Sequence, residues 1–254
     1  MISPHIHVPY DKIGENLSFI NEHKINLEIY FGSETLDRIG VGDTEKLLSR
    51  LEYAPSLSIH APFMDLSPGA VDSKAREITM ERFNQVMDIA SVLKPKVVVF
   101  HSGYEKWKYA LDIDLWLEKS LMTWHDIVER ALKMNTKVAI ENIFEDSPDN
   151  LRMLVEKVGS PFFGLCFDTG HFNLFSRVPL EEWIRQTGRH ITALHIHDND
   201  KTRDAHLSPG SGTFNFGLLF DLLKDRDDIV RTIEAHSKAE VLKSFAALKN
   251  LLTI

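Results

Sequence analysis

The sequence predicts an α/β fold, a (β/α)8 TIM barrel that forms a single domain over residues 1–254. The length of 254 residues is ordinary for one such barrel. Short apolar runs alternate strictly with segments of helical periodicity, which is typical of parallel strands joined by helices. No linker-like stretch interrupts this alternation.

Eight apolar runs, each bounded by turn signals, predict strands that are covered on both faces. In chain order they are Pro4–Val8, Asn26–Tyr30, Leu57–His60, Val97–His101, Lys137–Glu141, Gly164–Asp168, Thr192–His197 and Val230–Glu234.

Eight segments with helical periodicity follow these strands, and the last of them closes the chain. They are Asp11–His23, Asp43–Leu51, Ser73–Leu93, Asp114–Met134, Pro148–Val158, Pro179–Thr187, Phe216–Asp225 and Lys238–Leu251.

Composition limits the classes of partner. The chain has 37 acidic and 29 basic residues and a net charge of -8, which disfavours binding to nucleic acid or to an anionic membrane without excluding it. Cys166 is the single cysteine and lies in an apolar run, which excludes an internal disulfide and indicates a core position. There is neither a leader-like N-terminus nor a run long enough to span a membrane, so we expect a soluble, cytoplasmic protein.

Side chains that can bind metals stand at or just after seven of the eight predicted strands. The C-terminal ends of barrel strands share one rim, where groups from several strands meet. The second strand ends at Tyr30, after Glu28, and supplies no candidate. The candidates are His7, His60, His101, Glu141, Asp168 with His171, His195 with His197, and Glu234, and the loop after the seventh strand adds Asp204 and His206.

Imidazoles and carboxylates without thiolates favour divalent ions such as zinc or manganese. Any one of these histidines alone is readily explained as a hydrogen-bonded core or loop residue. Together they predict a site for one to three ions, because a rim of converging acids and imidazoles is costly to bury without a cation. Gly170 is expected to permit a tight turn that brings Asp168 and His171 together.

The number of ions bears on the substrate. Glu141, Asp168, Asp204 and Glu234 supply four negative charges, which two divalent ions would neutralise. One ion would leave the cavity negative and suited to a neutral polyol, whereas three would favour a phosphate.

Several motifs resemble those of the xylose isomerase-like TIM-barrel superfamily, which includes the family 2 AP endonucleases typified by endonuclease IV. They are His60-Ala61-Pro62, Phe100-His101-Ser102-Gly103, Ile140-Glu141-Asn142, Cys166-Phe167-Asp168-Thr169-Gly170-His171, Leu194-His195, and Asp204-Ala205-His206 with the loop after it. The resemblance covers nearly the whole chain.

The resemblance implies two kinds of metal centre. As in endonuclease IV, a trinuclear zinc site would use nine ligands, namely His60, His101, Glu141, Asp168, His171, His195, Asp204, His206 and Glu234. As in the sugar isomerases and epimerases, Glu141, Asp168, His195 and Glu234 would hold one manganese- or cobalt-type ion, and the two glutamates would shuttle the substrate proton.

The sequence also departs from endonuclease IV. Gly170 replaces its cysteine, and His197 replaces its asparagine in the strand-seven motif. Phe31-Gly32-Ser33-Glu34-Thr35 stands where the repair enzymes carry a basic, DNA-contacting segment. The ligands are retained while the DNA-binding features are missing.

Three functions remain open. The first is a sugar or sugar-phosphate isomerase or epimerase, with Glu141 and Glu234 as base and acid and a small carbohydrate or phosphorylated substrate. The alternative is metal-dependent hydrolysis, of an abasic-site phosphodiester or a smaller ester, which the nine-ligand set favours and the charge balance disfavours. The third is a metal-binding protein without catalysis.

Other residues are candidates for contacting the substrate or supporting the ligands, and no heptad seam or apolar patch indicates an oligomeric interface. The supporting candidates are His7, Trp107, Asn142, His197, Asp198, Lys201, Arg203 and His236. Trp116 and Trp124 lie eight residues apart in a helical stretch and are expected to pack in the core.

Overall fold

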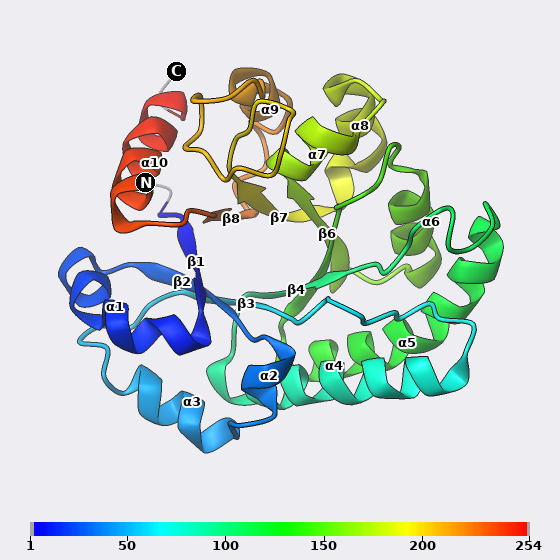
Figure 1. Cartoon of the computed structure of the whole chain (residues 1–254), viewed down its shortest axis with the longest axis horizontal. Coiled ribbons are helices and arrows are strands. Elements are labelled where there is room, and N and C mark those ends of the chain that lie inside the picture. The colour runs from blue at the N-terminus through cyan, green and yellow to red at the C-terminus, as the bar shows by residue number, and fades with distance from the viewer. Residues whose placement is uncertain (1–2, 253–254) are drawn as a thin grey trace.

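Each of the eight parallel strands pairs with its neighbour in sequence, and β1 pairs with β8, so the sheet closes into a barrel (Figure 1). The computed structural model describes residues 3–252. The strands are β1 (His5–Pro9), β2 (Asn26–Tyr30), β3 (Leu57–His60), β4 (Val97–His101), β5 (Lys137–Glu141), β6 (Phe163–Asp168), β7 (Ile191–Ile196) and β8 (Val230–Ile233).

Helices surround the barrel and join successive strands (Figure 1). They are α1 (Tyr10–His23), α2 (Ser33–Leu36), α3 (Val41–Leu48), α4 (Ser73–Leu93), α5 (Ile113–Met134), α6 (Asp149–Val158), α7 (Thr169–Phe175), α8 (Leu180–Thr187), the 3-10 helix η1 (Gly188–His190), α9 (Phe216–Leu222) and α10 (Lys238–Leu251).

The predicted TIM barrel is confirmed, and α4 and α10 have the predicted bounds. Both helices begin after a residue whose side chain accepts hydrogen bonds from the first turn, Asp72 for α4 and Ser237 for α10. Three short helices were not predicted, α2, α7 and η1. Each has seven residues or fewer, which is too short to show helical periodicity.

Burial on both faces of the sheet explains why the strands appear in the sequence as continuous apolar runs. Every residue of β4 and of β6 is buried, because helices cover the outside of the barrel and side chains fill the inside. Trp116 and Trp124 are fully buried between α5 and the barrel, as predicted, and Cys166 is buried too.

The barrel interior directly below the rim that carries the predicted ligands has two unlike halves. The polar half comes from β8, β1, β2 and β3 and consists of Thr232, His5, Glu28 and Ser58. The apolar half comes from β4 to β7 and consists of Val99, Ala139, Cys166 and Ala193.

Among residues 3–252, no helix combines the length and the apolar character needed to cross a bilayer.

Candidate metal centre

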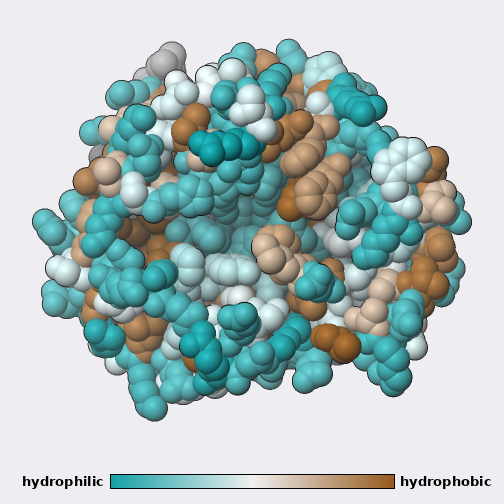
Figure 2. Space-filling model, viewed as in Figure 1, coloured by the Kyte–Doolittle hydropathy of each residue, from teal (hydrophilic) through white to brown (hydrophobic). Residues whose placement is uncertain are grey.

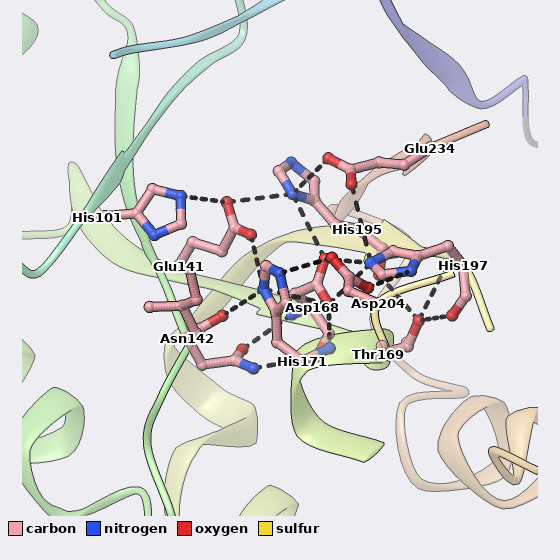
Figure 3. Close-up of polar contacts among 12 residues, drawn as sticks. His101, Glu141, Asn142, Asp168, Thr169, His171, His195, His197, Asp204 and Glu234 are labelled. Atoms are coloured by element: carbon pink, nitrogen blue, oxygen red, sulfur yellow. Dashed lines mark hydrogen bonds and ion pairs between the residues drawn. The ribbon is translucent and has the colours of Figure 1, made fainter. Parts of the chain in front are cut away.

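The strands end at a rim where the molecular surface is hollowed and lined by hydrophilic side chains (Figure 2). The nine predicted metal ligands converge there, and every one of them lies within 3.5 Å of another, nitrogen to oxygen. Figure 3 shows most of these side chains pointing toward one another from β4 to β8 and the loops after them.

The central group consists of Glu141, Asp168, His195 and Glu234. Nδ1 of His195 lies 3.2 Å from a carboxylate oxygen of Glu141, 3.2 Å from one of Glu234 and 3.8 Å from one of Asp168. His195 and Asp168 are fully buried, and Nδ1 of His195 makes no hydrogen bond with any described residue. A buried nitrogen that faces three carboxylates without a hydrogen bond fits a shared divalent cation.

His60 and His101 extend this group on the side of β3 and β4. Nε2 of His60 lies 3.1 Å and Nε2 of His101 lies 3.3 Å from the same oxygen of Glu141. Nδ1 of His60 lies 2.8 Å from the carbonyl oxygen of Ala61 and donates its proton there, so the lone pair of Nε2, which faces Glu141, could bind an ion shared with that carboxylate. These three residues therefore form a second set of suitable ligands.

The outer group consists of His171, His197, Asp204 and His206. Oδ2 of Asp204 lies 2.9 Å from Nε2 of His206 and 3.5 Å from Nε2 of His171, and Oδ1 lies 3.5 Å from Nδ1 of His197. His206 has a left-handed backbone with φ of 47°, a conformation that is costly for a residue other than glycine. The loop holds His206 in this conformation beside Asp204.

Gly170 was expected to permit a tight turn between Asp168 and His171, and this expectation is wrong. Gly170 lies inside α7 and is absent from the described glycines with positive φ, so it makes no special turn. A Cβ atom at this position would lie 2.0 Å from Cε1 of His197. Gly170 is required because the imidazole of His197 fills the space where a side chain would stand. Asp168 and His171 meet because Asp168 caps α7, accepting a hydrogen bond from the backbone N–H of His171.

Glu28 is the site residue that the sequence analysis missed. It is fully buried, and its Oε1 lies 2.8 Å from Nε2 of His195, on the far side of the ring from the central group. Its Oε2 accepts hydrogen bonds from Ser58 and Thr232. A charged residue in the middle of an otherwise apolar strand was the signal that could have identified it.

Two of the predicted supporting residues, Asn142 and Asp198, hold the predicted ligands in place. The side chain of Asn142 donates to the carbonyl of Asp168 and accepts from its N–H, tying β5 to β6. Asp198 accepts hydrogen bonds from the N–H groups of Gly210, Gly212 and Phe214. It thereby fixes the loop that carries Asp204 and His206.

The remaining predicted residues lie at different distances from the centre. His7 faces the rim, with its ring 5.6 Å from that of His60, and the ring of His236 lies 4.6 Å from that of His206. The structure does not bring Trp107, Lys201 or Arg203 into the group of ligands. Trp107 is 75% exposed, and Lys201 and Arg203 are exposed on the loop after β7.

Electrostatics favour ionised carboxylates at this rim. Burial would raise the pKa of Glu141 and of Glu234, but neighbouring imidazoles, His195 foremost, hold the pKa of both below the ordinary value. Burial would also raise the pKa of Glu28, but the neighbouring His195 outweighs this effect and lowers the pKa of Glu28 to about 2. Ionised carboxylates are the form that binds a divalent cation.

A cavity of about 480 Å³ opens beside the centre between α1 and α10. His7, Tyr30, His206 and Glu234 line its inner end. Lys12 and Lys238, both exposed, line it farther from the ligands. The cavity is large enough for a small carbohydrate.

Known proteins match this architecture. The family model for the xylose isomerase-like TIM barrel matches residues 28–251. The uncharacterized protein MJ1311 of Methanocaldococcus jannaschii is 33% identical over 217 residues, which are 81% of this chain and 73% of that protein.

Two solved structures superpose closely. A D-tagatose 3-epimerase-like protein is 27% identical with a TM-score of 0.82, covering 98% of this chain and 97% of its own. The TTHB071 protein from Thermus thermophilus, soaked with ZnCl2, is 25% identical with a TM-score of 0.82, covering 98% of both chains. With the family model matching nearly the whole chain, this protein belongs to the xylose isomerase-like TIM-barrel family.

Proposed function

We propose that this protein is a divalent-metal-dependent isomerase or epimerase that acts on a small sugar or sugar phosphate. The observation that carries the proposal is the placement of Glu141, at the end of β5, and Glu234, directly after β8, each 3.2 Å from the same nitrogen of His195. The similarity to a D-tagatose 3-epimerase-like protein supports the same class. The lone, buried Cys166 is compatible with work in a reducing compartment such as the cytoplasm.

Glu141, Asp168, His195 and Glu234 would hold the ion, with zinc or manganese as the best-matched metals. When bound, the ion orients adjacent substrate oxygens and makes the carbon-bound hydrogen between them more acidic. The similar TTHB071 protein was studied after soaking with ZnCl2, which supports zinc as a candidate metal.

The two glutamates would transfer the proton. Both are ionised at neutral pH, because the imidazoles around them lower the pKa of both carboxyl groups. One carboxylate removes the carbon-bound proton, and the other, which has taken up a proton from solvent, delivers it to the carbon; the first carboxyl group then releases its proton to solvent. Buried surroundings keep bulk water from quenching the carbanion between the two transfers.

The cavity between α1 and α10 would hold the rest of the substrate. Its inner end meets Glu234 and His206, and Lys12 and Lys238 could contact an anionic substituent at the other end. Lys12 also pairs with Glu15 at 3.3 Å, and Lys238 lies over the Phe19 ring. A phosphorylated sugar therefore fits as well as a neutral ketose.

Exchange of the substrate hydrogen with D2O tests this proposal directly. The protein, loaded in turn with Mn²⁺, Co²⁺ and Zn²⁺, is incubated in D2O with a panel of ketoses and sugar phosphates, and deuterium at carbon is measured by NMR. We expect incorporation with at least one substrate. Glu141→Gln and Glu234→Gln should each reduce it by about 100-fold or more.

The matched control is Glu105→Gln, an exposed carboxylate on the loop after β4, which should leave exchange unchanged. Failure of every metal and substrate combination to incorporate deuterium would reject the proposal. Equal exchange in wild type and in both glutamate variants would reject the assigned roles.

Metal-dependent hydrolysis, including an endonuclease IV-like phosphodiesterase, remains the second candidate because all nine residues of the larger ligand set do come together. Incubation with an abasic-site duplex and with simple phosphate esters tests it. Three bound ions and strand cleavage would favour this function over isomerisation.

A further inference from the structure

A second cavity, of about 350 Å³, lies at the rim between the loops that follow β3, β4 and β5. Phe63, Met64, Tyr104 and Phe144 line it, and His101 is its most deeply buried lining residue. We call this cavity the aromatic cleft. It shares no lining residue with the cavity between α1 and α10. Two separate spaces therefore reach the predicted ligands from different sides of the barrel.

The aromatic cleft is continuous with the candidate site through His101. Nε2 of His101 lies 3.3 Å from a carboxylate oxygen of Glu141, one of the two residues proposed to transfer the proton. The ring of Phe63 lies 4.4 Å from that of His101. A substrate that reacts at Glu141 can therefore extend past His101 and along Phe63 into the aromatic cleft.

Two apolar side chains of the cleft are open to solvent. Phe144 is 54% exposed and Met64 is 70% exposed. Figure 2 shows hydrophobic side chains at the edge of the hydrophilic hollow. Apolar side chains that gather on an exposed surface mark a place where a ligand or partner binds. Because this cleft opens on the candidate site, the occupant that the structure favours is a part of the substrate.

The ring of Phe144 is held in place before any ligand binds. The next residue, Glu145, is buried and accepts hydrogen bonds from the side chains of Ser102 and Asn150, both at 3.1 Å. The ring of Phe144 also contacts that of Phe175, with 5.3 Å between the ring centres. A ring that is already ordered loses little conformational entropy when a ligand packs against it.

We propose that the substrate is a glycoside, with its reacting sugar at the rim and a second ring packed on Phe144 in the aromatic cleft. The proposal rests on the proposed function and deepens it by naming the class of substrate. A free monosaccharide at Glu141 and Glu234 would leave the aromatic cleft unfilled. The second ring is either another sugar or an aromatic group, because both present an apolar face to an aromatic side chain.

Charge at the edge of the cleft favours a neutral second ring. The exposed side chains there are the carboxylates of Asp65 and Glu105 and the ammonium group of Lys108. Two negative charges against one positive charge disfavour a phosphate at this place. An anionic substituent is better placed in the other cavity, which Lys12 and Lys238 line.

Binding of matched glycosides tests the proposal without turnover. The Mn²⁺-loaded protein is titrated with the methyl, phenyl and glucosyl glycosides of the same set of sugars, and calorimetry gives each dissociation constant. We expect at least one phenyl or glucosyl glycoside to bind about 10-fold more tightly than the methyl glycoside of the same sugar. The phenyl and glucosyl series distinguish an aromatic second ring from a saccharide.

Phe144→Ala should abolish this 10-fold difference and leave the affinity for the methyl glycoside within about twofold of wild type. Phe144→Tyr keeps an aromatic ring and should retain the difference. The matched control is Met122→Ala, since Met122 is a similarly exposed apolar residue, at 57%, that lies on α5 away from the cleft. Circular dichroism checks that each variant is folded.

Equal affinities for methyl glycosides and their larger counterparts, or no binding of any glycoside, would overturn the proposal. An equal loss for all glycosides in folded Phe144→Ala would also overturn it. Sedimentation tests the other possible occupant: if Phe144→Ala dissociates a dimer and leaves the glycoside preference unchanged, the exposed rings form an interface between copies and the proposal is wrong.

The outcome also separates this proposal from the proposed function. Preferred binding of a larger glycoside without deuterium exchange in any substrate would reject the proposed function and leave the assignment of the cleft standing. Deuterium exchange in a monosaccharide, with no preference for larger glycosides, would do the reverse.

Discussion

The two halves of the barrel interior below the rim differ in chemistry although they come from the same kind of strand. In the polar half, Nδ1 of His5 lies 2.8 Å from Oγ of Ser58, which donates to Glu28, whose other oxygen contacts His195. In the apolar half, Val99 and Cys166 pack with the alanines of β5 and β7 and form no such chain.

The difference shows that one proposed metal ligand, His195, is held in place by a chain of buried polar contacts. Ser58 uses its only proton toward Glu28, so it must accept from Nδ1–H of His5, and Nε2 of His5 accepts from Ser56. The chain of contacts therefore ends with an ionised Glu28 that orients His195. The apolar half only fills space below His101, Glu141 and Asp168.

Glu28→Ala should have the largest effect in this comparison. It removes the carboxylate that Nε2 of His195 and the hydroxyl groups of Ser58 and Thr232 contact in a buried site, and loss of one member of a buried ion pair typically costs about 3–5 kcal/mol. We also expect metal affinity to fall by about 10- to 100-fold. Urea unfolding of the metal-free protein measures the first effect and Co²⁺ titration measures the second. If neither the free energy of unfolding nor the metal affinity changes, the proposed difference between the two halves is wrong.

Acidity should weaken the polar half through His5. Burial lowers the pKa of His5 to about 4, against the opposing effect of Glu28. Between pH 6.5 and pH 4 the unfolded chain therefore binds a proton that the folded chain does not. The free energy of unfolding should fall over this window as pH falls, by at most about 3 kcal/mol from this residue.

His5→Gln removes the titrating group, so its unfolding free energy should depend less on pH between 6.5 and 4 than that of the wild type. The difference between the two metal-free proteins isolates His5 from the other histidines. Parallel pH profiles for the two proteins would contradict the assignment.

Val99→Ala makes the corresponding change in the apolar half. Val99 is fully buried, so removing its two methyl groups should lower the unfolding free energy by about 2 kcal/mol. Metal affinity should stay within about twofold of wild type, because Val99 packs in the apolar half. An affinity loss as large as that of Glu28→Ala would remove the distinction between the halves.

Cys166→Ala should have the smallest effect. Burial raises the pKa of this thiol, so it stays neutral and is a poor metal ligand, although its sulfur lies within 4.8 Å of ligand atoms of Glu141 and His195. We expect a loss of about 1 kcal/mol in stability and an unchanged number of bound ions by elemental analysis. Loss of an ion would make Cys166 a ligand instead.

The barrel and most of its rim could be predicted from the sequence for a physical reason. Strand and helix periodicities are local, and parallel strands in a closed barrel bring their C-terminal ends to one rim. His60, His101, Glu141, Asp168 and Glu234 needed no further information, because each stands at the end of a strand or directly after it.

Contacts across the barrel could not be predicted in the same way. Glu28 reaches His195 from the opposite side of the interior, and no local pattern specifies which strands face one another at a given height. The short helix α7 was not predicted, because its seven residues make only two turns and show no clear helical pattern of apolar residues.

The sequence by itself determined the fold, the rim and the types of ligand, because these follow from the spacing of apolar and ionisable residues along the chain. The tertiary structure decided why Gly170 is glycine and what His197 and Glu28 contact. These contacts join residues that lie far apart in the sequence. Close packing around Gly170 and the burial of the Glu28 charge allow only one arrangement of the side chains there.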